Sequence, residues 1–204
     1  MRIAVLGASG RVGRLLVDQA LERGHQVVAL VRTPDRVAVP ASRQVVDVRQ
    51  ADVCSPQTFP GLDDVDAVVS AIGIGKDDGP GALVAGAGLL AAAHTRTVWL
   101  GALGSGPSER AGGLIYQAVM RMAVGAELAE KAEADQVARK GGATVFHAPD
   151  LKDGPLSVGR RLVPLADLRR PLLPPRISRA TVAALMLDEA QTGDNGGEIV
   201  VPLS

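Results

Sequence analysis

Three glycines near the N-terminus constrain the fold of this chain more than any other feature. Gly7, Gly10 and Gly13 follow directly after the apolar run 2–6 and precede residues 12–23, whose apolar positions have helical spacing. In such a turn, glycine lets the chain leave a strand sharply, approach a pyrophosphate closely and pack a helix on a sheet. The spacing alone is weak evidence in a chain with 24 glycines. Its place between a strand and a helix predicts a Rossmann-type βαβ unit.

The rest of the chain alternates between strand and helix patterns. This alternation predicts an α/β fold with a doubly wound parallel sheet and right-handed crossovers. The length of 204 residues suits one Rossmann domain spanning 1–204. Ser178 is expected to cap the last helix. The expected strands are 2–6, 26–31, 45–48, 66–72, 97–103, 143–147 and 198–201, and the expected helices are 12–23, 81–94, 113–140 and 179–190.

Residues 150–177 interrupt the alternation. This segment contains five prolines and several arginines. Long irregular segments in compact domains are often lids or binding loops. We interpret 150–177 as an irregular substrate-side segment, and the alternative is a surface excursion without contact to a ligand.

The glycine turn predicts a dinucleotide-binding site, with a purely structural turn as the alternative. The N-terminus of the following helix offers free backbone N–H groups and the positive end of the helix dipole to phosphates. A seryl hydroxyl within the turn can add a donor. The expected contacts come from Gly7, Ser9, Gly10, Arg11, Val12 and Gly13.

The end of the second expected strand indicates which dinucleotide is bound. NAD-binding folds usually place Asp or Glu there, to bond the ribose 2′-hydroxyl. This chain has Arg32 and Thr33, followed by Arg36. Because a guanidinium can hold a 2′-phosphate through paired hydrogen bonds, we predict NADP(H). Arg32 could instead be a solvated loop charge, and Asp35 could neutralise Arg36.

Asp52 and Val53 follow the third expected strand. In folds of this kind, that position can cover the adenine ring, with the carboxylate accepting from the adenine amino group. The alternative is that Asp52 caps the short segment after it.

These residues together resemble the atypical short-chain dehydrogenase/reductases. The similar branch is that of the small NAD(P)H-binding proteins, which includes the biliverdin reductase B/flavin reductase type and the NmrA-like regulators. The resemblance covers nearly the whole chain and implies a Rossmann fold, NADP(H), and often hydride transfer to a flavin, quinone, tetrapyrrole or carbonyl. It also implies that Ala71, Ile72 and Gly73 lie near the nicotinamide. It rests on the 7–13 turn, Val31-Arg32, Asp52-Val53, the run 70–73, Lys131 with Asp135, and the runs 139–142, 153–156 and 177–179.

The chain departs from this family at two places. Members often carry Ser at the end of the fifth strand, where it can help to orient a substrate. Here the stretch 101–104 has no hydroxyl, and the first one belongs to Ser105. Many relatives have Arg-Pro after the sixth strand, whereas this chain has His147-Ala148-Pro149 and lacks that arginine.

The Ser-Tyr-Lys machinery of ordinary short-chain dehydrogenases is also missing. In that machinery, Tyr-x-x-x-Lys places both side chains on one helix face, so that the ammonium lowers the tyrosine pKa. The only tyrosine is Tyr116, and Met120 stands four residues after it. Lys131 would lie about 22 Å further along a continuous helix. Flavins and quinones can take a proton from water, so hydride transfer to them can rest on positioning.

Tyr116, Lys131 and His147 are the candidate proton donors. His147 stands at the end of a strand, on the sheet edge where ligands bind in open α/β folds, although a structural histidine is the alternative. Lys131 and Asp135 have i, i+4 spacing on an expected helix, and an exposed surface pair is the alternative there. Trp99 is expected in the core.

Composition argues against several other classes of protein. The 22 basic and 22 acidic residues balance, so no strong field exists to hold nucleic acid or an anionic membrane. The longest apolar run, 82–93, is shorter than the roughly 20 residues that a membrane helix needs. Three scattered histidines and a single cysteine, Cys54, suggest no metal site. No targeting segment is visible, and we expect a cytoplasmic monomer or homodimer that acts on a small molecule.

The function predicted from sequence is that of an NADP(H)-dependent oxidoreductase that transfers hydride to a small conjugated or carbonyl acceptor. One alternative is a non-catalytic NADP(H)-binding redox sensor of NmrA type. Another is dehydration or epimerisation with a tightly held cofactor.

Overall fold

The computed structural model describes residues 1–34, 46–75, 79–109, 111, 114–169 and 176–204, with backbone alone for 114–126. An eight-stranded sheet has the order β3-β2-β1-β4-β5-β6-β10-β8. Its strands are β1 (Arg2–Leu6), β2 (Gln26–Val31), β3 (Val46–Gln50), β4 (Ala67–Ser70), β5 (Arg96–Ala102), β6 (Thr144–Ala148), β8 (Arg161–Pro164) and β10 (Ile199–Leu203). All neighbouring strands pair in parallel except β8, which runs antiparallel to β10. The predicted Rossmann-type fold is confirmed.

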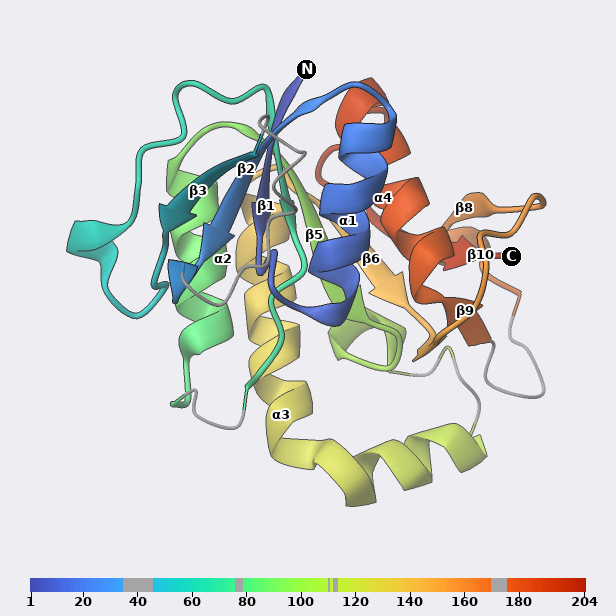
Figure 1. The fold of residues 1–204 in the computed structure, drawn as a ribbon. Coiled ribbons are helices and arrows are strands. Elements are labelled where there is room, and N and C mark those ends of the chain that lie inside the picture. The colour runs from blue at the N-terminus through green and yellow to red at the C-terminus, as the bar shows by residue number, and fades with distance from the viewer. Residues whose placement is uncertain (35–45, 76–78, 110, 112–113, 170–175) are drawn as a thin grey trace.

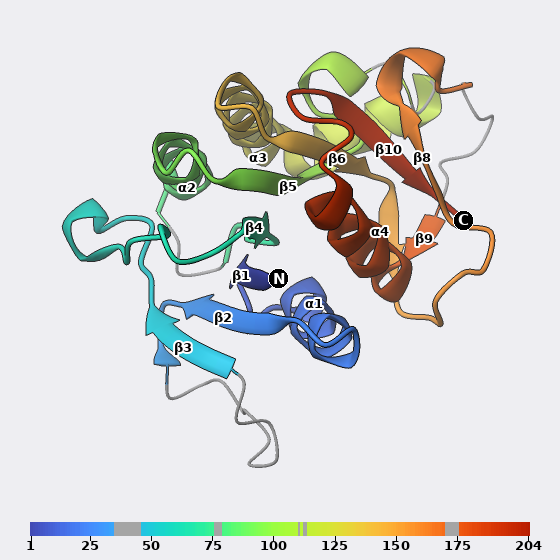
Figure 2. The same ribbon diagram turned by 90° about the horizontal axis from the view of Figure 1, so that it is seen from above.

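In the described part of the chain, four α-helices pack on the two faces of the sheet (Figures 1 and 2). They are α1 (Arg11–Glu22), α2 (Ala82–Ala92), α3 (Leu114–Lys140) and α4 (Arg179–Thr192). Helices α1 and α4 pack on one face, around Val5, Leu16 and Met186. Helices α2 and α3 pack on the other face, around Leu30 and Trp99. Because successive strand residues point to opposite faces and both faces are covered, the strands read as continuous apolar runs.

The strand order reverses between β1 and β4. The chain proceeds from β1 outward to β2 and β3, then returns to β4 on the other side of β1. In open α/β sheets, such a reversal leaves a crevice outside the carboxyl ends of the strands, and ligands bind there. The glycine turn lies at this point, directly after β1.

The segment 150–177 is more ordered than its sequence suggested, over the residues that are described. Strand β7 (Asp150–Lys152) pairs in parallel with β9 (Arg176–Ser178), and β8 extends the main sheet. These strands have three or four residues each, too few for an apolar periodicity to show. At the end of β9, the hydroxyl of Ser178 accepts a hydrogen bond from the backbone N–H of Thr181 and caps α4, as predicted.

Helix α3 is bent. Its C-terminal part packs beside α2, whereas its N-terminal part turns away and extends past the sheet edge (Figure 1). The backbone of Tyr116 belongs to this N-terminal part, and its side chain lies outside the described residues.

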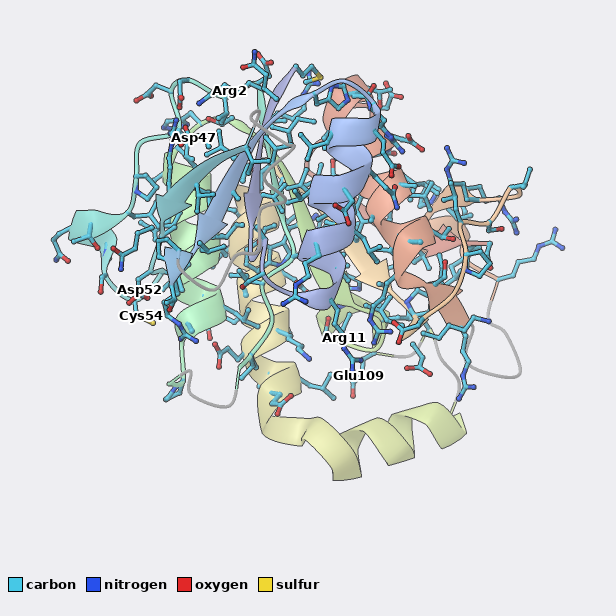
Figure 3. The ribbon with its side chains drawn as sticks, viewed as in Figure 1. Arg2, Arg11, Asp47, Asp52, Cys54 and Glu109 are labelled. Carbon is cyan, nitrogen blue, oxygen red and sulfur yellow. The ribbon has the colours of Figure 1, made fainter. Side chains whose placement is uncertain are left out.

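An ion cluster joins the amino ends of β1 and β3, far from the glycine turn. Figure 3 shows Arg2 and Asp47 at one end of the sheet, with Asp52 and Arg11 at the other. Arg49 donates hydrogen bonds to both Asp47 and Asp64. This contact with Arg49 is the main reason why the pKa of Asp64 is lowered to about 2.

This cluster predicts a small, pH-dependent contribution to stability. The folded pKa of Asp64 lies below the ordinary value of 3.8. Its contribution is therefore present above about pH 4 and is lost as the pH falls toward 2. Arg49→Met should lower Tm at pH 6 by no more than about 2 °C, because the pair is partly exposed to solvent and screened by it. The gap to wild type should narrow in melts at pH 2, and a constant gap would contradict the assignment. Arg161→Met, on β8, controls for the lost positive charge.

Candidate functional site

Two adjoining cavities open along the carboxyl edge of the sheet. The first, of about 300 Å³, lies over the ends of β1, β2 and β3, and we call it the β2-side cavity. The second, of about 530 Å³, lies over the ends of β4, β5 and β6, and we call it the β5-side cavity. They share a wall at the first turn of α1 and at the end of β4, formed by Gly10, Ala71, Ile72, Gly73, Gly75 and Leu83. The arrangement fits an elongated ligand that crosses the start of α1.

The glycine turn has the geometry of a phosphate site. Gly7 has a φ of +79°, and a β-carbon there would lie 3.1 Å from the backbone of Ala71. Helix α1 follows Gly10, which provides no side-chain cap to the first turn. The first backbone N–H groups of a helix have no partner within the helix, and Gly10, directly before α1, lines both cavities.

The other turn residues divide between the two cavities. Ser9 lines the β2-side cavity, whereas Arg11 and Val12 line the β5-side cavity. Gly13 lines neither of them. A β-carbon at Gly13 would lie 2.0 Å from the carbonyl oxygen of Gly7, so this glycine allows α1 to pack against the turn.

Arg32 stands in the β2-side cavity, directly after β2. Thr33 is exposed and does not line it, and Arg36 lies outside the described residues. Asp52 and Val53 line the same cavity from the end of β3. The Asp52 carboxylate also accepts a hydrogen bond of 3.0 Å from the backbone N–H of Cys54. Asp52 therefore makes a local turn contact and also lines the cavity, whereas the N-cap of the following 3₁₀ helix, Pro56–Thr58, is Ser55 and not Asp52.

Lys131 and Asp135 both line the β5-side cavity, one helical turn apart on α3. They do not form an exposed surface pair, and that alternative is wrong. The Lys131 ammonium lies 4.0 Å from Glu127 Oε2. Asp135 is only 3% exposed and accepts a hydrogen bond from Trp99. Asp135 reaches the sheet because Gly101 has no side chain: a β-carbon there would lie 2.6 Å from Asp135 Oδ1.

His147 lies behind this cavity instead of in it. It is fully buried, and it is not among the described residues that line either cavity. Its Nδ1 is 2.6 Å from the hydroxyl oxygen of Ser108, and its Nε2 is 3.2 Å from Asp135 Oδ2. His147 therefore does not reach a ligand directly, although it contacts a residue that does.

Ser105, Ser108 and Asp135 were not among the site residues predicted from sequence. Ser105 precedes a short 3₁₀ helix after β5, Gly106–Ser108, and Ser108 is the last residue of that helix. A glycine inside a strand often marks a close approach by another group. Gly101 was therefore the one sequence signal that could have indicated the buried carboxylate.

A profile of proteins described as NAD(P)H-binding matches residues 7–192, which is most of the chain. The chain belongs to this NAD(P)H-binding family. Its cofactor is therefore a nicotinamide dinucleotide. The predicted resemblance to small NAD(P)H-binding reductases is confirmed at the level of family and fold.

Among the curated relatives of this NAD(P)H-binding protein, two illustrate matches to parts of the chain. The photosystem II assembly factor Ycf39 of Synechocystis is 38% identical over 72 residues, which is 35% of this chain and 22% of the relative. The uncharacterized protein YwnB of Bacillus subtilis is 34% identical over 109 residues, 52% of this chain and 49% of the relative. The matched regions thus span half or less of each relative.

Solved structures match over the full length. The oxidoreductase ylbE of Lactococcus lactis has a TM-score of 0.80 at 19% identity, covering 100% of this chain and 91% of that one. The anaerobillin reductase ChuY of Escherichia coli O157:H7 has a TM-score of 0.75 at 20% identity, covering 100% and 97%. A proposed NADH-flavin reductase of Streptococcus pneumoniae has a TM-score of 0.71 at 21% identity, covering 100% and 99%. At these identities, the likeness concerns the fold.

Two kinds of feature are absent from the described part of the chain. No helix there combines the length and the apolar composition that a bilayer-spanning segment requires. No group of three or more His, Cys, Asp or Glu side chains in the same residues is placed to hold a metal ion.

Proposed function

We propose that this protein is an NADP(H)-dependent reductase that transfers hydride to a small conjugated or carbonyl acceptor. The observation that carries the proposal is the pair of cavities joined at the start of α1. One cavity has the size and position for the adenosine half of the cofactor. The other has room for the nicotinamide and an acceptor beside it. The reductases among the structural neighbours support this choice.

The residues of the crevice suggest how the cofactor would lie. The pyrophosphate would rest on Gly7, Gly10 and the first N–H groups of α1. Asp52 and Val53 would border the adenine, and Ala71 to Gly73 would border the nicotinamide. When bound, the nicotinamide supplies a hydride. The chain then has to hold the acceptor, exclude water and provide a proton, and Lys131 and Asp135 are the two ionisable side chains of α3 that line the β5-side cavity.

Arg32 is the proposed determinant of NADP(H) over NAD(H). Arg32→Asp should weaken NADPH binding roughly 100-fold, because charge-assisted hydrogen bonds to the 2′-phosphate are lost and a repulsive charge is introduced. NADH affinity should change only a few-fold. Calorimetric titration of both nucleotides measures the two constants. Equal losses would refute the 2′-phosphate contact. Arg161→Asp, on β8 at the far edge of the sheet, is the control for net charge.

Turnover tests the enzyme assignment. Oxidation of NADPH should be followed by absorbance in the presence of flavins, quinones, tetrapyrroles and small carbonyls, with nucleotide binding titrated in parallel. Turnover with one of these acceptors supports the reductase and identifies its substrate chemistry. Tight NADPH binding without turnover over the whole panel would favour the NmrA-type sensor.

The sensor is the second candidate because the chain lacks the Ser-Tyr-Lys set. The open volume of the β5-side cavity favours the enzyme, since a sensor needs no space beside the nicotinamide.

We also propose that residues 150–177 form a substrate-side segment of one domain. Leu151 of β7, which belongs to this segment, lines the β5-side cavity. A cytoplasmic location and a monomeric or homodimeric state stay predictions.

A further inference from the structure

A cluster of polar side chains lies behind the β5-side cavity. It consists of Trp99, Ser105, Ser108, Asp135 and His147, and each is at most 3% exposed. We call it the Asp135 network. The residues come from β5, the loop after β5, α3 and β6, so the fold gathers them from four places. An ionisable pair inside a core destabilises the fold unless its hydrogen bonds are satisfied. The number of hydrogen atoms that the contacts require therefore indicates the protonation state of the pair.

The contacts around the Asp135 carboxylate require one more hydrogen atom than the neighbouring donors supply. Asp135 Oδ1 accepts a hydrogen bond of 2.9 Å from the Trp99 indole. Asp135 Oδ2 is 2.8 Å from the Ser105 hydroxyl oxygen, which is also 2.8 Å from the carbonyl oxygen of Ala102. A serine hydroxyl has one hydrogen, so it can serve only one of these two oxygens. The other short contact needs a hydrogen from elsewhere.

The contacts of Ser108 indicate which ring nitrogen of His147 carries a hydrogen. Its hydroxyl oxygen accepts from the Gly104 N–H at 2.8 Å, lies 3.0 Å from the Ser105 carbonyl oxygen, and lies 2.6 Å from His147 Nδ1. If the hydroxyl donates to the carbonyl, Nδ1 carries a hydrogen and donates to Ser108. The second ring nitrogen, Nε2, then faces Asp135 Oδ2 at 3.2 Å. It is not aligned to bond with that atom and has no other partner among the described residues.

One additional proton on the Asp135–His147 pair relieves one of these two unfavourable contacts, and its position decides which one. On Asp135, it gives the Ser105 contact its missing hydrogen. On His147, it separates the Nε2 lone pair from the carboxylate oxygen. In either position, the pair carries no net charge, which lowers the cost of burial. Without that proton, a negative charge stays in the core with no described cation bonded to it.

We propose that Asp135 and His147 share one buried proton and that Asp135 delivers it to the acceptor bound in the β5-side cavity. Asp135 is assigned the delivery because it lines the cavity and His147 does not. This inference rests on the proposed function, since reduction by hydride is completed by one proton. The carboxyl O–H bond breaks, the acceptor gains an O–H or N–H bond, and the electron pair remains on the carboxylate.

The pair then has one negative charge until solvent restores the proton. Asp135 also lines a third cavity, of about 390 Å³, on the side of Pro107 and Gln136. We propose this side as the route by which solvent restores the proton, since a bound acceptor in the β5-side cavity does not occupy it.

The first arm of the test determines the protonation states of Asp135 and His147 in the unliganded wild-type protein. NMR measures the ¹³Cγ shift of Asp135 and the ¹⁵N shifts of His147 at pH 7, with His25→Gln and His94→Gln used for assignment. The expected result is either a protonated Asp135 or a His147 that is protonated on both nitrogens. A carboxylate beside a neutral imidazole would overturn the shared proton. This arm depends on neither cofactor nor turnover.

The second arm measures delivery. Asp135→Asn should leave the Kd for NADPH within about 2-fold and slow turnover by about 100-fold or more, the usual range for a lost general acid. Asp194→Asn, in the loop after α4, makes the same chemical change away from both cavities and should alter neither value. If Asp135→Asn does not fold, His147→Asn takes its place, with KM retained and turnover about 10-fold slower.

The outcomes separate the two proposals. Wild-type turnover by Asp135→Asn would overturn delivery by this residue. Failure of the wild type itself to bind or oxidise NADPH would overturn the proposed function, and with it delivery, whereas the NMR arm would still decide the shared proton.

Discussion

Gly13→Ala is expected to destabilise the protein severely. The added β-carbon would lie 2.0 Å from the carbonyl oxygen of Gly7 and 2.8 Å from Cα of Ala8. Both are backbone atoms, so no side chain can rotate away. Helix α1 would have to move off the sheet, and its core residues Val12 and Leu16 would move with it. We expect the free energy of unfolding to fall by about 3 kcal/mol or more, measured by urea unfolding.

A glycine in another helix provides the control. Gly88 lies in α2, and a β-carbon added there would have nothing within 4 Å. Gly88→Ala should therefore raise the free energy of unfolding by up to about 1 kcal/mol through helix propensity. A Gly13→Ala protein as stable as wild type would mean that α1 does not pack on the turn as described.

Gly10→Val is expected to abolish binding of both NADPH and NADH while the fold is retained. Gly10 has a φ of −74° and a ψ of 172°, which an L-residue can adopt. A β-carbon there meets only the Gly7 carbonyl oxygen, at 3.2 Å. The isopropyl group would instead occupy the shared wall of the two cavities, where the pyrophosphate is proposed to lie. We expect each affinity to fall by roughly two orders of magnitude or more, because the phosphates lose the helix N-terminus.

Titrations of the Gly10→Val and Arg32→Asp variants with both nucleotides can be compared directly. Arg32→Asp should discriminate between the two nucleotides, whereas Gly10→Val should affect both equally. Circular dichroism and a thermal melt establish that Gly10→Val is folded. Retained affinity in a folded variant would show that the phosphates bind elsewhere.

Much of the fold was predictable because its signals are local. The second strand was expected at 26–31 and forms Gln26–Val31. The first helix was expected at 12–23 and forms Arg11–Glu22. In these segments, an apolar run or a helical apolar face is bounded by glycine, and burial on both sides of the sheet agrees with the local pattern. The glycine turn was predictable for the same reason.

The Asp135 network was not predictable because its contacts are distant in sequence. Trp99 and Asp135 stand 36 positions apart, and His147 and Ser108 stand 39 apart. Whether Asp135 is exposed or buried depends on which way α3 faces when it packs on β5. The i, i+4 spacing of Lys131 and Asp135 is compatible both with an exposed surface pair and with a buried Asp135. Only the packing of α3 over Gly101 decides between these two arrangements.

Trp99 is the only tryptophan in the chain. It lines the β5-side cavity and donates its indole hydrogen to Asp135. All indole fluorescence of this protein therefore originates at one wall of the proposed reaction chamber. Reduced nicotinamide absorbs in the range where indole emits, so energy transfer would report occupancy of that chamber without any attached dye. The protein thus has an intrinsic optical probe at the place where its chemistry is proposed to occur.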